Sequence, residues 1–276
     1  MDNSILQSMH QFTRQHGRDL MVQSTRWRYY ALGQGSVVLW LTGGLRRAAF
    51  GFAFLERLAR THRVIAPDYP PLMTFRELAK GFDAILRAEG VARFDLGGQS
   101  YGGLLAQGYL ALHPDPVGRL ILSSTGPADY GRQWLLADYI GIGVVRLLPE
   151  QRVKRMLAAG LGKILSVPAA ERQAWQEALE HVLKHELTRQ DVVSHFAVAA
   201  DLIRSRLVVP RSFEAWQGRV FVLSAANDPT QSPADIPRYE TLFRRPVVVL
   251  DMGSAGHTAA LVDPDSYVDM LERALA

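Results

Sequence analysis

The 276-residue chain has no cysteine. This absence excludes disulfide bonds, thiolate catalysis and Cys-ligated zinc, and nothing in the sequence requires an oxidising compartment. Long apolar runs are missing too, because no stretch approaches the roughly 20 apolar residues that span a membrane. The amino-terminal stretch MDNSILQSMHQFTRQHGRDL lacks the apolar core of a secretory signal. These absences predict a cytoplasmic protein with no membrane span.

Clusters of like charge are also absent, although the formal net charge is +4 and the pI is near 9.5. The basic residues form only short pairs, at 46–47, 154–155 and 244–245, with mixed charges between them. A protein that binds nucleic acid concentrates Lys and Arg on one surface. The composition, 48% hydrophobic and 21% charged, is that of a folded globular protein. We therefore expect a solvated basic surface and no nucleic-acid partner.

Strand-like and helix-like segments alternate along most of the chain. The segments 26–32 and 36–41 flank a Gly-Gln-Gly turn, and we expect them to pair as a hairpin. The later alternation is that of βαβ units, which place strands in parallel and helices on both faces of a sheet. Further strands are expected from about 63, 92, 119, 218 and 245, and helices from about 48, 74 and 101. The fold class is therefore α/β with a mostly parallel central sheet.

The strand pattern stops between residues 125 and 211, where four helix-like segments follow one another. This part of the chain interrupts the series of strands instead of following it. We expect residues 128–210 to form an inserted helical cap over the carboxyl ends of the strands. Residues 1–127 and 211–276 then form the core, and some apolar residues of the cap are expected to line a pocket for an acyl chain.

The motif Gly98-Gln99-Ser100-Tyr101-Gly102 carries the strongest chemical signal. It matches G-x-S-x-G between an expected strand and an expected helix, a context in which a tight turn exposes the serine hydroxyl. Glycine at 98 and 102 leaves room for the close backbone approach that such a turn needs. Nucleotide-binding folds also use Gly-rich turns, but this turn does not have their G-x-G-x-x-G spacing. We interpret Ser100 as a nucleophile.

A serine hydroxyl needs an imidazole to accept its proton and a carboxylate to orient that imidazole. His257 follows the last expected strand, and Asp228 follows the strand before it. Loops after parallel strands meet at one edge of the sheet, so both side chains are expected near Ser100. Asp235 and Asp251 are the alternative acids.

These motifs resemble the α/β-hydrolase superfamily from about Trp27 to the carboxyl terminus. The chain order Ser100, Asp228, His257 is that of the family. The segments VIAPDYP and GHTAALVDPDSYVDML are similar to family signatures. The resemblance implies an α/β-hydrolase fold with a catalytic triad at these positions.

The resemblance also implies an oxyanion hole. The segment Thr42-Gly43-Gly44 stands where many members have His-Gly-x, so the backbone N–H groups of Gly44 and Tyr101 are the expected donors. Thr42 replaces the common histidine of the family. A simple turn at the end of a strand is the alternative interpretation of this segment.

A second departure is Tyr69-Pro70-Pro71, which stands where many members have an Arg-Gly-His-Gly type of loop. Both this Tyr-Pro and the WRYY strand resemble maspardin-like relatives, a branch in which the catalytic set can be incomplete. In this chain the triad positions are filled. A non-catalytic binding or scaffold protein that retains the fold is therefore the alternative to an enzyme.

A metal site is a weaker hypothesis. His181 and His185 lie one helical turn apart and have the spacing to bind a metal with His195 or Glu186, but they belong to a charged helix that we interpret as solvated. We expect no metal and no cofactor.

The sequence thus predicts a carboxylesterase-like serine hydrolase that acts on a small or medium ester-like molecule through an acyl-enzyme on Ser100. Iminopeptidase, thioesterase, lactonase and carbon-carbon bond hydrolase activities remain alternatives, because the fold hosts many reactions. The expected partner is a small-molecule substrate, and the sequence indicates no face for oligomerisation.

Overall fold

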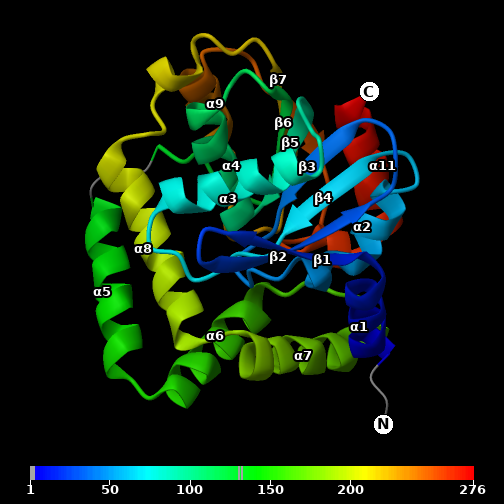
Figure 1. Cartoon of the computed structure of the whole chain (residues 1–276), viewed down its shortest axis with the longest axis vertical. Helices are drawn as coiled ribbons and strands as arrows, with labels where there is room; N and C mark the ends of the chain where they lie inside the picture. The colour runs from blue at the N-terminus through cyan, green and yellow to red at the C-terminus, as the bar shows by residue number, and fades with distance from the viewer. Residues whose placement is uncertain (1–3, 130, 132) are drawn as a thin grey trace.

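An eight-stranded sheet forms the centre of the computed structural model, which describes residues 4–129, 131 and 133–276 (Figure 1). The spatial order of the strands is β1-β2-β4-β3-β5-β6-β7-β8. β2 is antiparallel to β1 and to β4, and the other neighbouring pairs are parallel. The predicted mostly parallel sheet is confirmed. The strands are β1 (Gly17–Val22), β2 (Thr25–Leu32), β3 (Val37–Leu41), β4 (Arg63–Pro67), β5 (Phe94–Gln99), β6 (Val117–Ser123), β7 (Arg219–Ser224) and β8 (Val248–Asp251).

The predicted hairpin between 26–32 and 36–41 is wrong, because β4 lies between these two segments. Ile65 of β4 pairs with Ala31 of β2 on one side and with Leu39 of β3 on the other. β3 consists of apolar residues that are almost all buried, and a strand covered on both faces is favoured inside a sheet with parallel neighbours. The turn after β2 therefore reverses the chain without joining neighbouring strands.

β1 is a strand that the sequence pattern did not indicate. It lies at the edge of the sheet, pairs with no strand of the described chain other than β2, and has no fully buried residue. An edge strand needs no apolar run, and charged side chains protect its free edge from other strands. In β1 the carboxylate of Asp19 pairs with Arg26 and Arg28 of β2. Its apolar run, Leu20-Met21-Val22, was too short to indicate a strand in the sequence.

Helices cover both faces of the sheet, as predicted. Alternate residues of β3 point to opposite faces, so that Leu39 packs with the core under α3, α4 and α9, whereas Trp40 packs with α2 and α11. The helices outside the segment between β6 and β7 are α1 (Ser4–His16), α2 (Phe52–Leu58), α3 (Phe75–Ala88), α4 (Tyr101–Leu112), α9 (Asp235–Phe243), α10 (Ala259–Val262) and α11 (Pro264–Leu275).

Between β6 and β7 the described chain is helical and contains no strand. In Figure 1, α5 and α8 run beside each other at the left, and α6 and α7 lie below the sheet. The helices are α5 (Gln133–Leu147), α6 (Glu150–Ile164), α7 (Arg172–His181) and α8 (Arg189–Ser205). Residues 1–3, 130 and 132, which the predicted core and cap segments include, lie outside the described residues.

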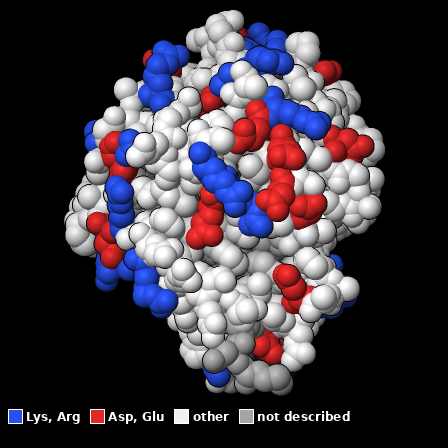
Figure 2. All heavy atoms as spheres, turned by 90° about the vertical axis from the view of Figure 1, so that its right-hand side faces the viewer, with Lys and Arg blue, Asp and Glu red and all other residues white. Residues whose placement is uncertain are grey.

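Charges of both signs are interspersed on the face shown in Figure 2. Charged side chains also form ion pairs with one another, such as Glu89 with Arg18 and Arg63. None of the helices in the described ranges has the length and apolar character that crossing a bilayer requires.

Candidate active site

Ser100 lies in a strained turn between β5 and α4, where its backbone has φ 54° and ψ −120°. The neighbouring glycines make this turn possible. A Cβ atom on Gly102 would lie 1.9 Å from the carbonyl oxygen of Leu41, and one on Gly98 would lie 2.3 Å from the carbonyl oxygen of Gly102. Only glycine fits at both positions, so the sequence motif corresponds to a real packing constraint.

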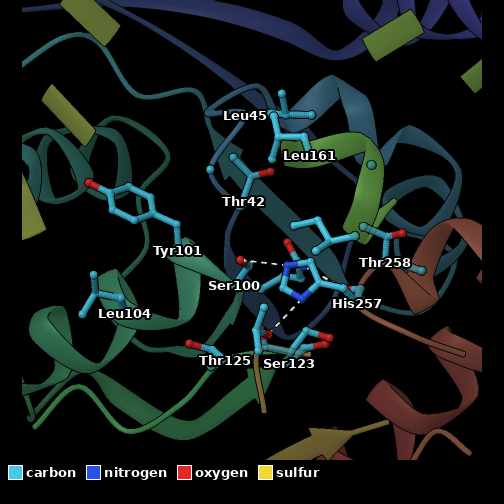
Figure 3. Close-up of a pocket in the computed structure, with 18 of the residues that line it drawn as sticks. Thr42, Leu45, Ser100, Tyr101, Leu104, Ser123, Thr125, Leu161, His257 and Thr258 are labelled. Carbon is cyan, nitrogen blue, oxygen red and sulfur yellow. Dashed lines mark hydrogen bonds between the residues drawn. The ribbon is translucent and has the colours of Figure 1, made fainter. Parts of the chain in front are cut away.

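The structure brings Ser100, His257 and Asp228 together. His257 Nε2 lies 3.0 Å from Ser100 Oγ (Figure 3), and His257 Nδ1 lies 3.0 Å from Asp228 Oδ1. Asp228 follows β7 and His257 follows β8, so the two loops meet Ser100 at the carboxyl edge of the sheet. His257 and Asp228 are each only 4% exposed, which keeps their hydrogen bonds away from bulk water.

The alternative acids lie elsewhere. Asp235 is the first residue of α9, accepts a hydrogen bond from the backbone N–H of Ser232 and pairs with Arg238, and Asp251 accepts a hydrogen bond from the backbone N–H of Gly253. Within the described part of the chain, neither of them bonds to His257. Of the three acids that the sequence offered, Asp228 is the one in contact with the imidazole.

Asp228 is held as a carboxylate. Burial alone would raise its pKa, but hydrogen bonds with His257 and Thr230 lower the pKa below the ordinary value. Thr230 contributes its hydroxyl, 2.7 Å from Asp228 Oδ1, and its backbone N–H, 2.9 Å from the same oxygen. An ionised Asp228 favours the imidazole tautomer with its proton on Nδ1, which leaves Nε2 free to accept a proton.

Two residues beside this group were not singled out in the sequence. Thr230 follows Asp228 by two positions, the spacing at which an aspartate accepts from a backbone N–H in a turn, so this signal was available. Gln99, one residue before Ser100, donates from its side chain to the carbonyl oxygen of His257, at 3.1 Å. This second bond crosses from β5 to the histidine loop and required the structure to find.

Gly44 and Tyr101 line the same cavity as Ser100, from two different elements. Gly44 lies in the loop after β3, and Tyr101 is the first residue of α4, where backbone N–H groups have no partner inside the helix. The Tyr-Pro segment supports the first of these loops, because Tyr69 is buried and donates from its hydroxyl to the carbonyl oxygen of Thr42, at 2.8 Å. Tyr69 thus packs beneath the loop after β3 and holds it through this hydrogen bond.

The histidines considered for a metal site are separated. The rings of His181 and His185 lie 4.8 Å apart, but His195 stacks on Tyr101 with a centroid distance of 4.0 Å. Burial and the nearby Arg46 lower the pKa of His195 to about 3, so its ring is neutral. In the described ranges no group of three or more potential ligands is close enough to hold a metal ion.

A cavity of about 520 Å³ opens above Ser100. Leu161 from α6 and Leu45 from the loop after β3 lie together on one side of the Ser100–His257 pair in Figure 3, and Leu104 lies on another. Helices α5, α6, α7 and α8 all contribute residues to the wall. The cavity is largely apolar and has the size of a small-molecule site.

A family model described as alpha/beta hydrolase fold matches residues 23–264. This range is most of the 276 residues, so the chain belongs to the α/β-hydrolase family. The comparison with curated proteins found no match.

Solved structures share the fold over nearly the whole chain. A hydrolase from Pseudomonas aeruginosa PA01 is 21% identical, with a TM-score of 0.72 and coverage of 94% of this chain and 98% of its own. The enol-lactonase from Burkholderia xenovorans LB400 is 16% identical, with a TM-score of 0.72 and coverage of 94% and 99%. A haloalkane dehalogenase loop variant from Bradyrhizobium elkanii is 16% identical, with a TM-score of 0.65 and coverage of 92% and 94%. At these identities the likeness concerns the fold, which hosts several reactions.

Proposed function

We propose that the protein is a serine hydrolase that cleaves a small or medium ester-like substrate through an acyl-enzyme on Ser100. The observation that carries this proposal is the 3.0 Å distance between Ser100 Oγ and His257 Nε2, with Asp228 bonded to the other ring nitrogen. In such an arrangement the imidazole accepts the serine proton as the hydroxyl oxygen attacks a carbonyl carbon.

In the first half of the reaction, Ser100 Oγ forms a bond to the carbonyl carbon and its proton moves to His257 Nε2. The backbone N–H groups of Gly44 and Tyr101 donate hydrogen bonds to the oxyanion that develops. When the tetrahedral intermediate collapses, the leaving group takes the proton from His257 and the acyl group stays on Ser100. Asp228 orients the ring and stabilises the imidazolium.

In the second half, a water molecule gives a proton to His257 and attacks the acyl carbon. Collapse of the second intermediate releases the acid, and the proton returns from His257 to Ser100 Oγ. The reaction is balanced with ester and water as reactants and acid and alcohol as products, and it uses no cofactor.

Residues 128–210 act in this proposal as a cap that shapes the substrate site. Leu161 and Ile164 of α6 and Leu179 of α7 line the cavity beside the triad. Apolar walls favour an apolar acyl or alkyl group, because its burial contributes about 25 cal/mol per Å² removed from water. This wall supports a carboxylesterase-like substrate preference.

A fluorophosphonate probe tests the proposal, because it bonds covalently to an activated serine. We expect the wild-type protein to take the label, Ser100→Ala to take none, and His257→Ala to take far less. Ser36→Ala is the matched control, since Ser36 is exposed in the turn before β3. The wild-type protein should also hydrolyse p-nitrophenyl butyrate. A folded wild-type protein that takes no label and cleaves no ester across a panel of acyl lengths would support the scaffold alternative instead.

A further inference from the structure

The wall of the cavity is chemically uneven. Among the described residues that line it, Asp138 of α5 is the one carboxylate, and none is Lys or Arg. Most of the wall is apolar. A single carboxylate in an apolar wall loses hydration, and this loss costs free energy unless a partner group compensates for it. Its position is also unexpected because the chain as a whole is basic, with a formal net charge of +4.

Asp138 has no partner of its own within the part of the chain that the structure describes. No hydrogen bond or ion pair to its half-buried carboxylate occurs there, whereas Asp129 and Asp235 are both paired with Arg238. Burial raises the pKa of Asp138 to about 6, so the group remains largely ionised at neutral pH. The cavity therefore contains an uncompensated negative charge.

Trp134 lies one helical turn before Asp138. Residues four positions apart share one face of a helix, and both side chains line the cavity. This face of α5 offers a carboxylate and an indole ring to whatever occupies the cavity. The two groups attract the same class of ligand, because a carboxylate pairs with a cation and an aromatic face binds one through its π electrons.

The groups opposite α5 do not neutralise the carboxylate. Tyr101 of α4 lies close enough to Asp138 for the two groups to influence each other electrostatically. Burial raises the pKa of Tyr101 to about 12, which keeps its phenol uncharged at neutral pH. His195 of α8 is also uncharged near neutral pH, because burial and Arg46 lower its pKa to about 3. The charge of Asp138 thus remains available to a ligand.

We propose that Asp138 and Trp134 form a subsite for a cationic group, so that the substrate is an ester-like molecule that carries an ammonium group. This inference rests on the proposed function only in taking the cavity over Ser100 as the substrate site. An anionic substrate is disfavoured, because a carboxylate or phosphate near Asp138 would be repelled. A neutral substrate would leave the carboxylate desolvated and unpaired.

Binding to the Ser100→Ala variant tests the subsite without hydrolysis. Calorimetry would compare hexylammonium with 1-hexanol, two ligands with the same chain that differ in charge. We expect hexylammonium to bind about tenfold more tightly, as expected for a charge-assisted hydrogen bond in a partly dry site. In Ser100→Ala/Asp138→Asn this preference should fall to near one. Equal binding of the two ligands to Ser100→Ala would overturn the inference.

Two further variants make the result specific. Asp115→Asn in the same background removes an equal charge from an exposed position before β6. This position lies near the amino-terminal end of that strand, away from Ser100, so the variant should retain the tenfold preference. Asp138→Glu keeps the charge and should also retain a preference for the cation. If Asp115→Asn lowers the preference as much as Asp138→Asn does, the effect is general and the subsite is refuted.

The same samples separate this inference from the proposed function. Fluorophosphonate labelling of the wild-type protein without any cation preference in Ser100→Ala would refute the subsite and leave the hydrolase assignment in place. Cation preference in Ser100→Ala without labelling of the wild-type protein would support the subsite and count against the hydrolase.

Discussion

The hydroxyl of Thr230 donates a hydrogen bond of 2.7 Å to Asp228 Oδ1, the same oxygen that lies 3.0 Å from His257 Nδ1. The hydroxyl oxygen of Thr230 is also 3.0 Å from that ring nitrogen. One threonine side chain thus touches both the carboxylate and the imidazole. We infer that Thr230 is a positioning residue, which acts on Ser100 through its two neighbours.

The first prediction concerns this contact. Thr230→Val removes the hydroxyl at nearly constant volume and should lower kcat for p-nitrophenyl butyrate about tenfold, or about 1.4 kcal/mol. The pKa of Asp228 should rise because a hydrogen bond to its ionised form is lost. The mechanism needs ionised Asp228. As the pH is lowered, the Thr230→Val variant should therefore lose activity at a higher pH than the wild-type protein does. A kcat–pH profile measures both effects.

Thr230→Ser restores the hydroxyl and should recover both kcat and the acid limb. Thr241→Val is the matched control, because Thr241 is exposed on α9 and bonds only within that helix. A Thr230→Val profile that overlays the wild-type profile would show that the hydroxyl has no positioning role.

The second prediction concerns the turn at the nucleophile. A methyl group on Gly102 would overlap the carbonyl oxygen of Leu41, a backbone atom that cannot move without shifting β3. Gly102→Ala should therefore reduce the free energy of unfolding by about 3 kcal/mol. Gly143→Ala should do the opposite and stabilise by about 0.5–1 kcal/mol, because Gly143 is helical and, apart from its chain neighbours and the backbone of its own helix, no described atom lies within 4 Å of its added Cβ. Urea unfolding of both variants gives the comparison, and equal effects would contradict it.

The location of Ser100, Asp228 and His257 could be predicted because each residue follows an apolar, strand-like segment of the sequence within a few positions. Parallel strands end at one edge of the sheet, so local patterns were enough to expect the three loops together. Strand order was harder, because β4 is inserted between β2 and β3 through pairings that are not local. The hairpin prediction failed for that reason.

The residues that line the cavity from the helices could not be predicted in the same way. α5 is apolar on several sides, with Leu136 and Leu147 strongly exposed, so its periodicity does not indicate which face meets the core. Whether Asp138 faces the cavity or the solvent depends on how α5 packs along α8. His195 was considered in the sequence only as a possible metal ligand, and its place in the cavity wall against Tyr101 was not predicted.

The third prediction concerns stability and pH. The carboxyl group of Asp68 is buried and accepts a hydrogen bond of 2.7 Å from the backbone N–H of Ala48. Burial raises its pKa to about 7, from 3.8 in the unfolded chain. Between these two values the folded state binds more protons than the unfolded state, so the contribution of Asp68 to stability falls as pH rises from about 4 to about 7.

Asp68→Asn keeps the accepting oxygen and cannot ionise. It should exceed the wild-type protein in free energy of unfolding by about 2 kcal/mol at pH 8, and the difference should vanish below about pH 4. Urea unfolding across this range measures the difference. Asp115→Asn, at an exposed position, should show no comparable divergence, and a constant offset for Asp68→Asn at every pH would contradict the linkage.

The last prediction is the pH dependence of the cation preference in the Ser100→Ala variant. Hexylammonium stays protonated up to about pH 10, like a lysine side chain. Asp138, with a pKa of about 6, is ionised above that pH and neutral below it. The preference for hexylammonium over hexanol should therefore be full at pH 8 and decline toward one at pH 5. The bound cation counteracts the effect of burial and lowers the pKa of Asp138, so the midpoint should lie somewhat below 6.

The other titratable groups around the subsite do not interfere with the assignment of this pH dependence to Asp138. Tyr101 and His195, which face α5 from α4 and α8, have pKa values of about 12 and about 3 and do not change charge between pH 5 and pH 8. His257 lines the same cavity and is present in both variants, so any effect that it has on ligand binding would persist in Ser100→Ala/Asp138→Asn. Because Asp138→Asn removes the carboxylate alone, the double variant should bind the two ligands with a ratio near one at every pH. A preference that still changes with pH in that variant would assign the titration to a group other than Asp138.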